Sequence, residues 1–236
     1  MRALDEIRAQ NDAADLLVAD LTSQAEVRRL ATEFRARHDQ LHVLVNDAGP
    51  YVPDRRVTVD GLESTLALNH LAPYLLTNLL GDLLVASAPA RVVTVTSGAQ
   101  SMGRIRFDDL QGERRYGPQR AYAQSKLANV LFTYEPARRL EGTGVTATCV
   151  HPGVVRTRFG SDSPGLFRLA VLLTRPFART PARGAGTVGW AASSLEAEGL
   201  SGLYLVDRRA RRTNPLSYDH GEPTAAGERR AHRARS

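Results

Sequence analysis

Short apolar runs alternate with longer segments of helical periodicity along most of this chain. Apolar or β-branched runs predict buried strands at five places, namely 15–20, 41–45, 91–96, 145–150 and 202–206. Between them, apolar positions recur every three or four residues, which predicts helices over 2–10, 24–37, 61–86, 119–141, 165–177 and 182–197. Strands alternating with helices are typical of an α/β fold, a doubly wound parallel sheet covered on both faces.

Two prolines and the C-terminal segment interrupt this pattern. Pro73 predicts a bend in the helix over 61–86, and Pro136 is unexpected inside the helix over 119–141. Residues 98–118 are expected to form an irregular loop. Periodicity ends after residue 206, so we expect one domain over 1–206 and a disordered basic tail over 207–236.

Composition narrows the class of protein and its compartment. A chain of 236 residues suits one domain with a buried core. The single cysteine excludes an internal disulfide framework and fits a reducing compartment. The charged N-terminus lacks the apolar core of a signal peptide, and no apolar run is long enough to span a bilayer. We therefore expect a cytoplasmic protein without a membrane partner.

The net charge of +6 comes mostly from the C-terminal tail, where 207–236 hold eight arginines against four acidic residues. A solvated tail is the favoured interpretation, and a nucleic-acid partner is not expected. The basic residues also differ strongly in type. Of the 31 arginines and lysines, Lys126 is the only lysine. Arginine cannot replace lysine where a compact ammonium serves two close partners, although chance is the simpler explanation.

Tyr122 and Lys126 are four residues apart and share one face of the predicted helix over 119–141. A free phenol has a pKa of ~10, too high for proton transfer at neutral pH. A nearby ammonium lowers that pKa, so the pair could act as a general acid/base toward an alcohol or carbonyl. The alternative is an accidental pair on a helix surface.

Ser97 and Asn69 are further catalytic candidates. Ser97 follows the strand at 91–96 and could hydrogen-bond a substrate oxygen, or could serve only a turn. Asn69 lies in an apolar helical stretch, where a buried amide needs partners. It could hold a water that links to Lys126, or bond only to backbone, and the two roles are compatible.

Cofactor candidates follow three of the predicted strands, at the edge of a parallel sheet where ligands bind. Asp20 could accept a hydrogen bond from an adenine amine, or cap the helix over 24–37. Small side chains after Asn46 would let a flat ring approach the backbone, or form a plain turn. The segment after His151 could line a nicotinamide, or form a rigid turn. These residues are Asp20, Leu21, Asn46, Ala48, Gly49, Pro152, Gly153, Val155 and Thr157. No metal site is expected.

Taken in this order, the motifs resemble the short-chain dehydrogenase/reductase family. The matching elements are Asp20-Leu21, Asn46-x-Ala48-Gly49, Asn69, Ser97, Tyr122-x-x-x-Lys126 and Pro152-Gly153. The stretch over 103–113 and the long Ser97–Tyr122 spacing are similar to its retinol dehydrogenase-like branch. The resemblance covers 1–206 and implies a Rossmann-like fold. It also implies an oxidoreductase that uses NADP or NAD to interconvert an alcohol and a carbonyl.

The resemblance also implies a role for each catalytic candidate. Tyr122 would exchange the proton, and Lys126 would lower its pKa and bond the nicotinamide ribose. Ser97 would orient the substrate oxygen, and Asn69 would organise a proton-relay water. The substrate would be a small alcohol or carbonyl compound, and homo-oligomers are common in the family.

The chain departs from the family pattern at its start. The family opens with a strand, a Thr-Gly-x-x-x-Gly-x-Gly turn, a helix and a second strand, whereas the first glycine here is Gly49. We expect an N-terminally truncated fold that lacks this first strand–helix–strand unit. In the family's strand order the run at 15–20 would then lack neighbours, and the strand at 41–45 would become an apolar edge. Asp47 also stands where the family usually has asparagine.

Three functions follow as alternatives. The first is the oxidoreductase, with a start codon recorded too far downstream. The second is a catalytically inactive, truncated remnant that acts, if at all, as a partner-binding protein. The third is a nucleic-acid-binding module that uses the tail, which the charge distribution does not favour.

Overall fold

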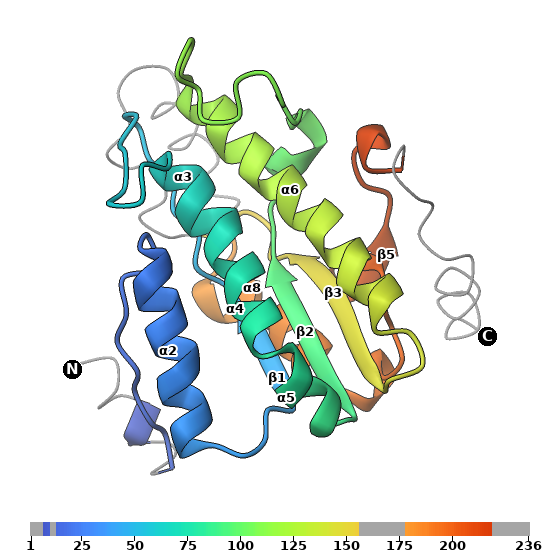
Figure 1. Cartoon of the computed structure of the whole chain (residues 1–236). Coiled ribbons are helices and arrows are strands. Elements are labelled where there is room, and N and C mark those ends of the chain that lie inside the picture. The colour runs from blue at the N-terminus through green and yellow to red at the C-terminus, as the bar shows by residue number, and fades with distance from the viewer. Residues whose placement is uncertain (1–6, 10–12, 156–177, 219–236) are drawn as a thin grey trace.

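The computed structural model describes residues 7–9, 13–155 and 178–218. Its five strands form one sheet in the order β1-β2-β3-β4-β5, parallel except for the last pair (Figure 1). The strands are β1 (Val43–Asn46), β2 (Ala90–Val95), β3 (Val145–His151), β4 (Leu203–Val206) and β5 (Arg209–Arg211). The α/β fold with a mainly parallel sheet is thus confirmed.

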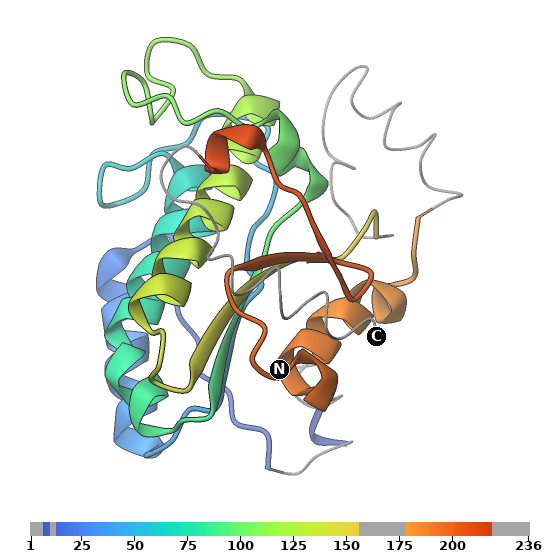
Figure 2. The same cartoon turned by 90° about the vertical axis from the view of Figure 1, so that its right-hand side faces the viewer.

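Helices cover both faces of this sheet, as Figure 2 shows. One layer contains α2 (Gln24–Arg37), α3 (Ser64–Leu66), α4 (Ala72–Leu79), α5 (Gly81–Ala86) and α6 (Pro118–Arg139). The opposite face is covered by α8 (Pro181–Ser193). Adjacent side chains of a strand point to opposite faces. Accordingly, Val92 packs with Leu84 of α5, while Val93 packs with Ala191 of α8.

Pro73 shapes the predicted helix over 61–86 in an unexpected way. The helix is divided into α3, a π-helical turn over Ala67–Leu71, α4 and α5. Pro73 has no N–H to donate to the carbonyl of Asn69, four residues earlier. That carbonyl instead accepts a hydrogen bond of 2.8 Å from the Asn129 side chain. The irregularity therefore precedes Pro73 and lies at Asn69, rather than forming a bend at the proline.

The strand predicted at 15–20 is wrong. These residues have no regular secondary structure, and Leu16 and Val18 are exposed. An isolated strand has no backbone partners, so an apolar run alone cannot form one. Within the described residues β1 pairs only with β2 and is an edge strand, on which Val43 and Val45 are 37% and 40% exposed. The predicted apolar edge is confirmed.

The expected domain end at residue 206 is also wrong. The strand β5 pairs with β4 in antiparallel register, and a short 3₁₀ turn follows at Pro215–Ser217. Asn214 is buried and donates from its side chain to the carbonyls of Gln100 and Gly103. Residues 207–218 therefore belong to the domain, and the rest of the predicted tail lies outside the described residues.

The remaining helices agree with the pattern where the structure describes them. Pro136 is accommodated in the last turn of α6, and the helix predicted over 165–177 lies outside the described residues. No helix in the described part of the chain combines the length and apolar character needed to cross a membrane.

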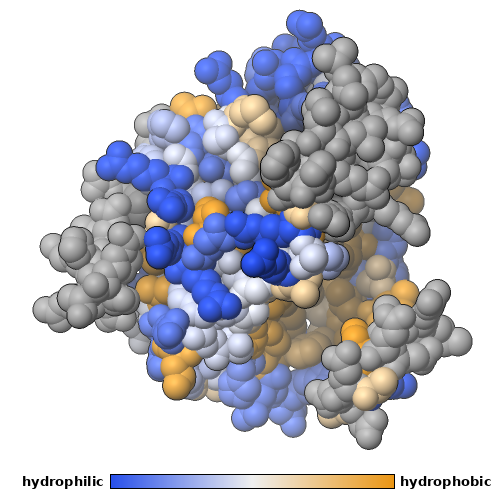
Figure 3. Space-filling model, turned by 180° about the vertical axis from the view of Figure 1, so that it is seen from behind, coloured by the Kyte–Doolittle hydropathy of each residue, from blue (hydrophilic) through white to orange (hydrophobic). Residues whose placement is uncertain are grey.

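On the back of the molecule, hydrophobic side chains show in the lower half, where the surface is hollowed (Figure 3).

Candidate active site

Three candidate motifs lie at the carboxyl ends of neighbouring parallel strands. Asn46 ends β1, Ser97 follows β2 by two residues, and Pro152 follows β3 directly. Asn46 pairs in register with Thr94 of β2, which lies beside Cys149 of β3. The sheet therefore brings these motifs to one edge, which is where ligands bind in open parallel sheets.

Tyr122 and Lys126 lie on the face of α6 that packs against the sheet. Lys126 is only 2% exposed, and its ammonium donates to the carbonyl of Val95, at 3.2 Å. Its Nζ lies 5.6 Å from the centre of the Tyr122 ring, a cation–π distance. A buried ammonium needs compensation, so this lysine is not an accident of an exposed helix surface.

Gly49 makes room for this ammonium. A Cβ at Gly49 would lie 2.5 Å from Lys126 Nζ and 3.5 Å from Asn69 Oδ1. Both polar atoms thus approach one point beside the backbone of Gly49. The absence of a side chain at Gly49 lets the backbone after β1 contact Lys126 of α6 and Asn69 of the π-helical turn.

Asn69 is fully buried, and its contacts fit the structural and the functional role together. Its amide nitrogen donates to the Pro50 carbonyl and to Ser125 Oγ, each at 3.1 Å. Its Oδ1 is buried without a hydrogen-bond partner among the described residues. The amide orientation is thereby fixed, and one acceptor remains available toward Lys126.

Sequence reasoning missed two residues that support Asn69. Asn129 is buried, donates to the Asn69 carbonyl, and lies 3.0 Å from His70 Nδ1 through its Oδ1. Ser125 accepts from Asn69 and donates to the carbonyl of Tyr122. One signal was present in the sequence: Pro73, four residues after Asn69, leaves a helix carbonyl that requires another donor.

Ser97 reaches Tyr122 and also serves a turn. Its Oγ accepts from the backbone N–H of Ala99 at 3.3 Å, and it shares a side-chain hydrogen bond with Tyr122. Burial raises the pKa of Tyr122, and the Ser97 hydrogen bond offsets this only in part. The expected net lowering of this pKa is therefore not found, because burial disfavours the phenolate. Tyr122 is a protonated phenol at neutral pH.

Lys126 shows the opposite shift. Burial lowers the pKa of Lys126 to about 8, and the Asp47 carboxylate acts in the other direction. A lysine in this state is mainly charged at neutral pH and loses its proton just above it. Asp47, which departs from the family pattern, thus helps to keep the ammonium charged.

We expect a direct measurement to find the Lys126 pKa near 8. Because Lys126 is the only lysine, a chain labelled with ¹³Cε-lysine gives a single NMR signal to titrate. Asp47→Asn removes the favourable charge and should lower the pKa further, whereas Asp54→Asn is a control with the same charge change. A Lys126 pKa near the ordinary ~10.4, unchanged in Asp47→Asn, would contradict this description of the site.

The segments expected to line a cofactor differ in their burial and in their backbone conformation. Asn46 is buried and donates to Thr77 Oγ1 at 3.0 Å, while Ala48 beside it is exposed. Gly153 has φ of +84°, which favours glycine, and so forms the rigid turn considered as its alternative role. Val155 is half-buried and forms an isolated bridge with Arg179. Thr157 lies outside the described residues.

Asp20 and Leu21 are not at the end of a strand, so the premise for their cofactor role is absent. The Asp20 carboxylate accepts from the backbone and hydroxyl of Thr22, at 2.9 and 2.7 Å. These hydrogen bonds lower the pKa of Asp20. The N-cap of α2 is Ser23, so Asp20 does not cap this helix, which was its alternative role.

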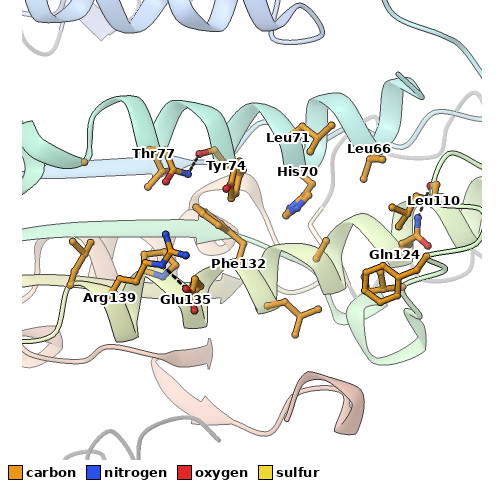
Figure 4. A pocket seen from close by; sticks show the side chains of 18 of the residues that line it. Leu66, His70, Leu71, Tyr74, Thr77, Leu110, Gln124, Phe132, Glu135 and Arg139 are labelled. Atoms are coloured by element: carbon orange, nitrogen blue, oxygen red, sulfur yellow. Dashed lines mark hydrogen bonds and ion pairs between the residues drawn. The ribbon is translucent and has the colours of Figure 1, made fainter. Parts of the chain in front are cut away.

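A cavity of about 450 Å³ lies on the other side of α6, away from this site. Figure 4 shows Tyr74 and Phe132 pointing toward one another across it, from α4 and α6. Its α6 lining recurs at helical spacing over Gln124, Ala128, Leu131 and Glu135, whereas Tyr122 and Lys126 do not line it. This apolar cavity is therefore not part of the candidate active site. Nowhere in the described ranges do His, Cys, Asp and Glu gather as a metal site would require.

Comparison with known proteins adds independent findings. A family profile described as short chain dehydrogenase matches residues 1–164. Human retinol dehydrogenase 12 is 46% identical over 207 residues, which cover 87% of this chain and 65% of that protein. The chain thus spans about 65% of the length of that relative.

Two solved structures show the same fold, and the match covers about 80% of each of them. An uncharacterised protein from Mycobacterium paratuberculosis is 31% identical, with a TM-score of 0.67 over 97% of this chain and 80% of its own. A putative NAD(P)-dependent gluconate 5-dehydrogenase from Beutenbergia cavernae, with bound NADP, is 27% identical. Its TM-score is 0.67, and the match covers 86% of this chain and 79% of its own.

Proposed function

The chain belongs to the short-chain dehydrogenase family, and we propose that Tyr122 is the general acid/base with which it interconverts an alcohol and a carbonyl. One observation carries this proposal. The Lys126 ammonium is buried beside the Tyr122 ring and converges with Asn69 Oδ1 at the backbone of Gly49. A buried ammonium and a fixed amide oxygen beside a phenol are the groups that a proton relay to that phenol requires.

The protonated state of Tyr122 suits the direction of carbonyl reduction. With its pKa raised by burial, the phenol holds its proton at neutral pH and can donate it to a carbonyl oxygen. Ser97, which hydrogen-bonds Tyr122, orients the same oxygen. Alcohol oxidation would require the phenolate, which is the form that burial disfavours.

Lys126 and Asn69 return the proton to Tyr122. The ammonium stabilises the phenolate left after proton donation, because opposite charges attract strongly in a buried site. Asn69 Oδ1 accepts from a water that also contacts Lys126, which opens a path for the proton from solvent. Ser125 and Asn129 act through Asn69 by fixing its side chain and carbonyl.

The residues present fit the nicotinamide half of a dinucleotide cofactor. When bound, NADP(H) supplies or accepts the hydride, and the bound NADP of the related gluconate 5-dehydrogenase structure favours NADP(H) over NAD. Lys126 would hold the nicotinamide ribose, and Gly153 and Val155 would line the nicotinamide. Within the 236 residues no glycine precedes Gly49, so these residues present no glycine-rich turn to the phosphates.

The names of the relatives support one class of substrate. Retinol dehydrogenase 12 is by its name a dehydrogenase of retinol, a long apolar alcohol. We therefore propose an apolar alcohol, aldehyde or ketone as substrate. Longer aliphatic aldehydes should be reduced with higher kcat/KM than short ones, because each added methylene contributes apolar burial.

Gly49→Ala is expected to reduce carbonyl reduction by about tenfold or more without unfolding the protein. The added Cβ displaces only the flexible end of Lys126, and a small displacement of a catalytic group is costly. Activity is measured in an extended chain, in which a strand–glycine-rich turn–helix–strand unit of another family member precedes Met1. Gly186→Ala is the control, because its Cβ meets nothing within 4 Å. Equal activities of the two variants would contradict the proposed role of Gly49.

We expect NADPH to bind the 236-residue chain weakly or not at all, with a Kd well above the low micromolar range. The reason is the lack of backbone amides for the phosphates, and not a defect near Tyr122. Isothermal titration compares the 236-residue chain with the extended chain, and tighter binding is expected only in the latter. Low micromolar affinity of the unextended chain would overturn this expectation.

A further inference from the structure

A second cavity, of about 330 Å³, lies beside the first turns of α6, where the loop before this helix folds over it. Four arginines line this cavity, which we call the arginine pocket: Arg104, Arg106, Arg115 and Arg120. None of the four candidate catalytic residues lines it. The pocket is therefore separate from the proposed reaction site.

The four guanidinium groups have no carboxylate partner within the described part of the chain. Two acidic residues line the pocket, but their carboxylates are already engaged by backbone amides. Asp109 accepts from the N–H groups of Arg114 and Arg115, and Glu63 caps α3 through the N–H groups of Thr65 and Leu66. Among the contacts within the described ranges, Arg120 alone of the four makes a side-chain hydrogen bond, to the carbonyl of Arg115.

The framework that presents these arginines is held at both ends. At its start, a Cβ on Gly103 would lie 2.5 Å from the carbonyl of Ala123, so the loop contacts α6 closely. In its middle, the Gln124 side chain accepts from the N–H of Arg106 and donates to the carbonyl of Leu110. Near its end, the Tyr116 hydroxyl donates to the carbonyl of Val52, at 3.1 Å.

Four arginines against two carboxylates leave the lining of this cavity with a net positive charge, which an anion between the guanidinium groups would offset. Guanidinium groups present paired N–H donors that match the oxygens of a phosphate. We propose that the arginine pocket binds the phosphate group of a small phosphorylated ligand. The cavity volume lies at the lower end of the ~300–1,000 Å³ typical of ligand pockets, which leaves space for a small body beside the phosphate.

The test compares variants with the same change of net charge. Arg104→Gln/Arg106→Gln removes two charges from the pocket. Arg28→Gln/Arg183→Gln removes two exposed arginines elsewhere, neither of which makes a side-chain ion pair in the described residues. Inorganic pyrophosphate is titrated calorimetrically into the 236-residue protein and both variants at 0.15 M salt. We expect saturable one-site binding that weakens at least tenfold in the pocket variant and less than twofold in the control.

Other outcomes overturn the proposal. Equal weakening in both variants would show attraction to overall charge, and a lack of saturation would show that no site exists. A second arm uses phosphatidylcholine vesicles containing phosphatidic acid. Binding to these vesicles without binding of pyrophosphate would show that the arginines recognise a lipid surface instead. Because pyrophosphate needs neither Tyr122 nor a dinucleotide, this result is independent of the proposed oxidoreductase function.

Discussion

Replacing Tyr122 with phenylalanine is expected to reduce carbonyl reduction by the extended chain at least ~100-fold, the effect typical of losing a general acid. The ring and its packing remain, including the edge contact with the Tyr51 ring at 6.0 Å between centres. Only the exchangeable proton is lost. The change should therefore lower kcat, while the affinity for NADPH remains nearly the same.

A matched control is available on the same helix. Tyr134 is also a partly buried tyrosine of α6, and its hydroxyl lies 2.8 Å from Thr213 Oγ1, away from the candidate site. Tyr134→Phe should lose a structural hydrogen bond, with an effect on stability of ~1 kcal/mol, but should retain turnover. Normal turnover in Tyr122→Phe, or equal losses in the two variants, would show that Tyr122 is not the proton donor.

Lys126→Arg is expected to cause a comparably large loss of turnover although the positive charge is kept. Lys126 is 2% exposed and is enclosed by Gly49 and the carbonyl of Val95. A planar guanidinium is larger and has a different donor geometry, so it cannot occupy this space and also bond a ribose. We expect a lower kcat together with weaker NADPH binding in the extended chain.

The pH dependence of the residual activity distinguishes the effect of the altered side-chain geometry in Lys126→Arg from the effect of the charge at residue 126. With Lys126 the ammonium is lost as pH rises through its pKa of about 8, so carbonyl reduction should decline above that pH. Arginine does not titrate in this range, so the decline attributable to residue 126 should vanish in the variant. Full activity of Lys126→Arg, with an unshifted profile, would mean that the single lysine is an accident of composition.

Local sequence patterns were sufficient to predict the elements that bury a regular apolar face. The helix over 24–37 and the central strands were predicted within a residue or two, because periodicity and β-branched runs report directly on burial. The apolar run at 15–20 carries the same local signal, but a strand exists only with a paired neighbour, which no local pattern reveals. For the same reason β5 was missed, since two of its three residues are the charged Arg209 and Arg211, and the strand is ordered by pairing with β4.

The candidate site divides in a similar way. Tyr122, Lys126, Ser97 and Asn69 were predicted because their order and spacing match a family motif, and the structure brings them close together. Asn129 was missed because its partner is the carbonyl of Asn69, sixty residues earlier in the chain. The direction of the Tyr122 pKa was also not predictable, because it depends on how much of the phenol is buried.

The central claim, reversible hydride chemistry dependent on Tyr122, is tested most directly by isotope transfer. The extended chain is incubated at neutral pH with an aliphatic aldehyde and NADPH in which both hydrogens at the nicotinamide C4 are replaced by deuterium. Mass spectrometry then follows the alcohol product. We expect the product to gain one deuterium at the former carbonyl carbon, and this labelled product to fall at least ~100-fold in Tyr122→Phe. Absence of labelled alcohol, or equal labelling by Tyr122→Phe, would contradict the account.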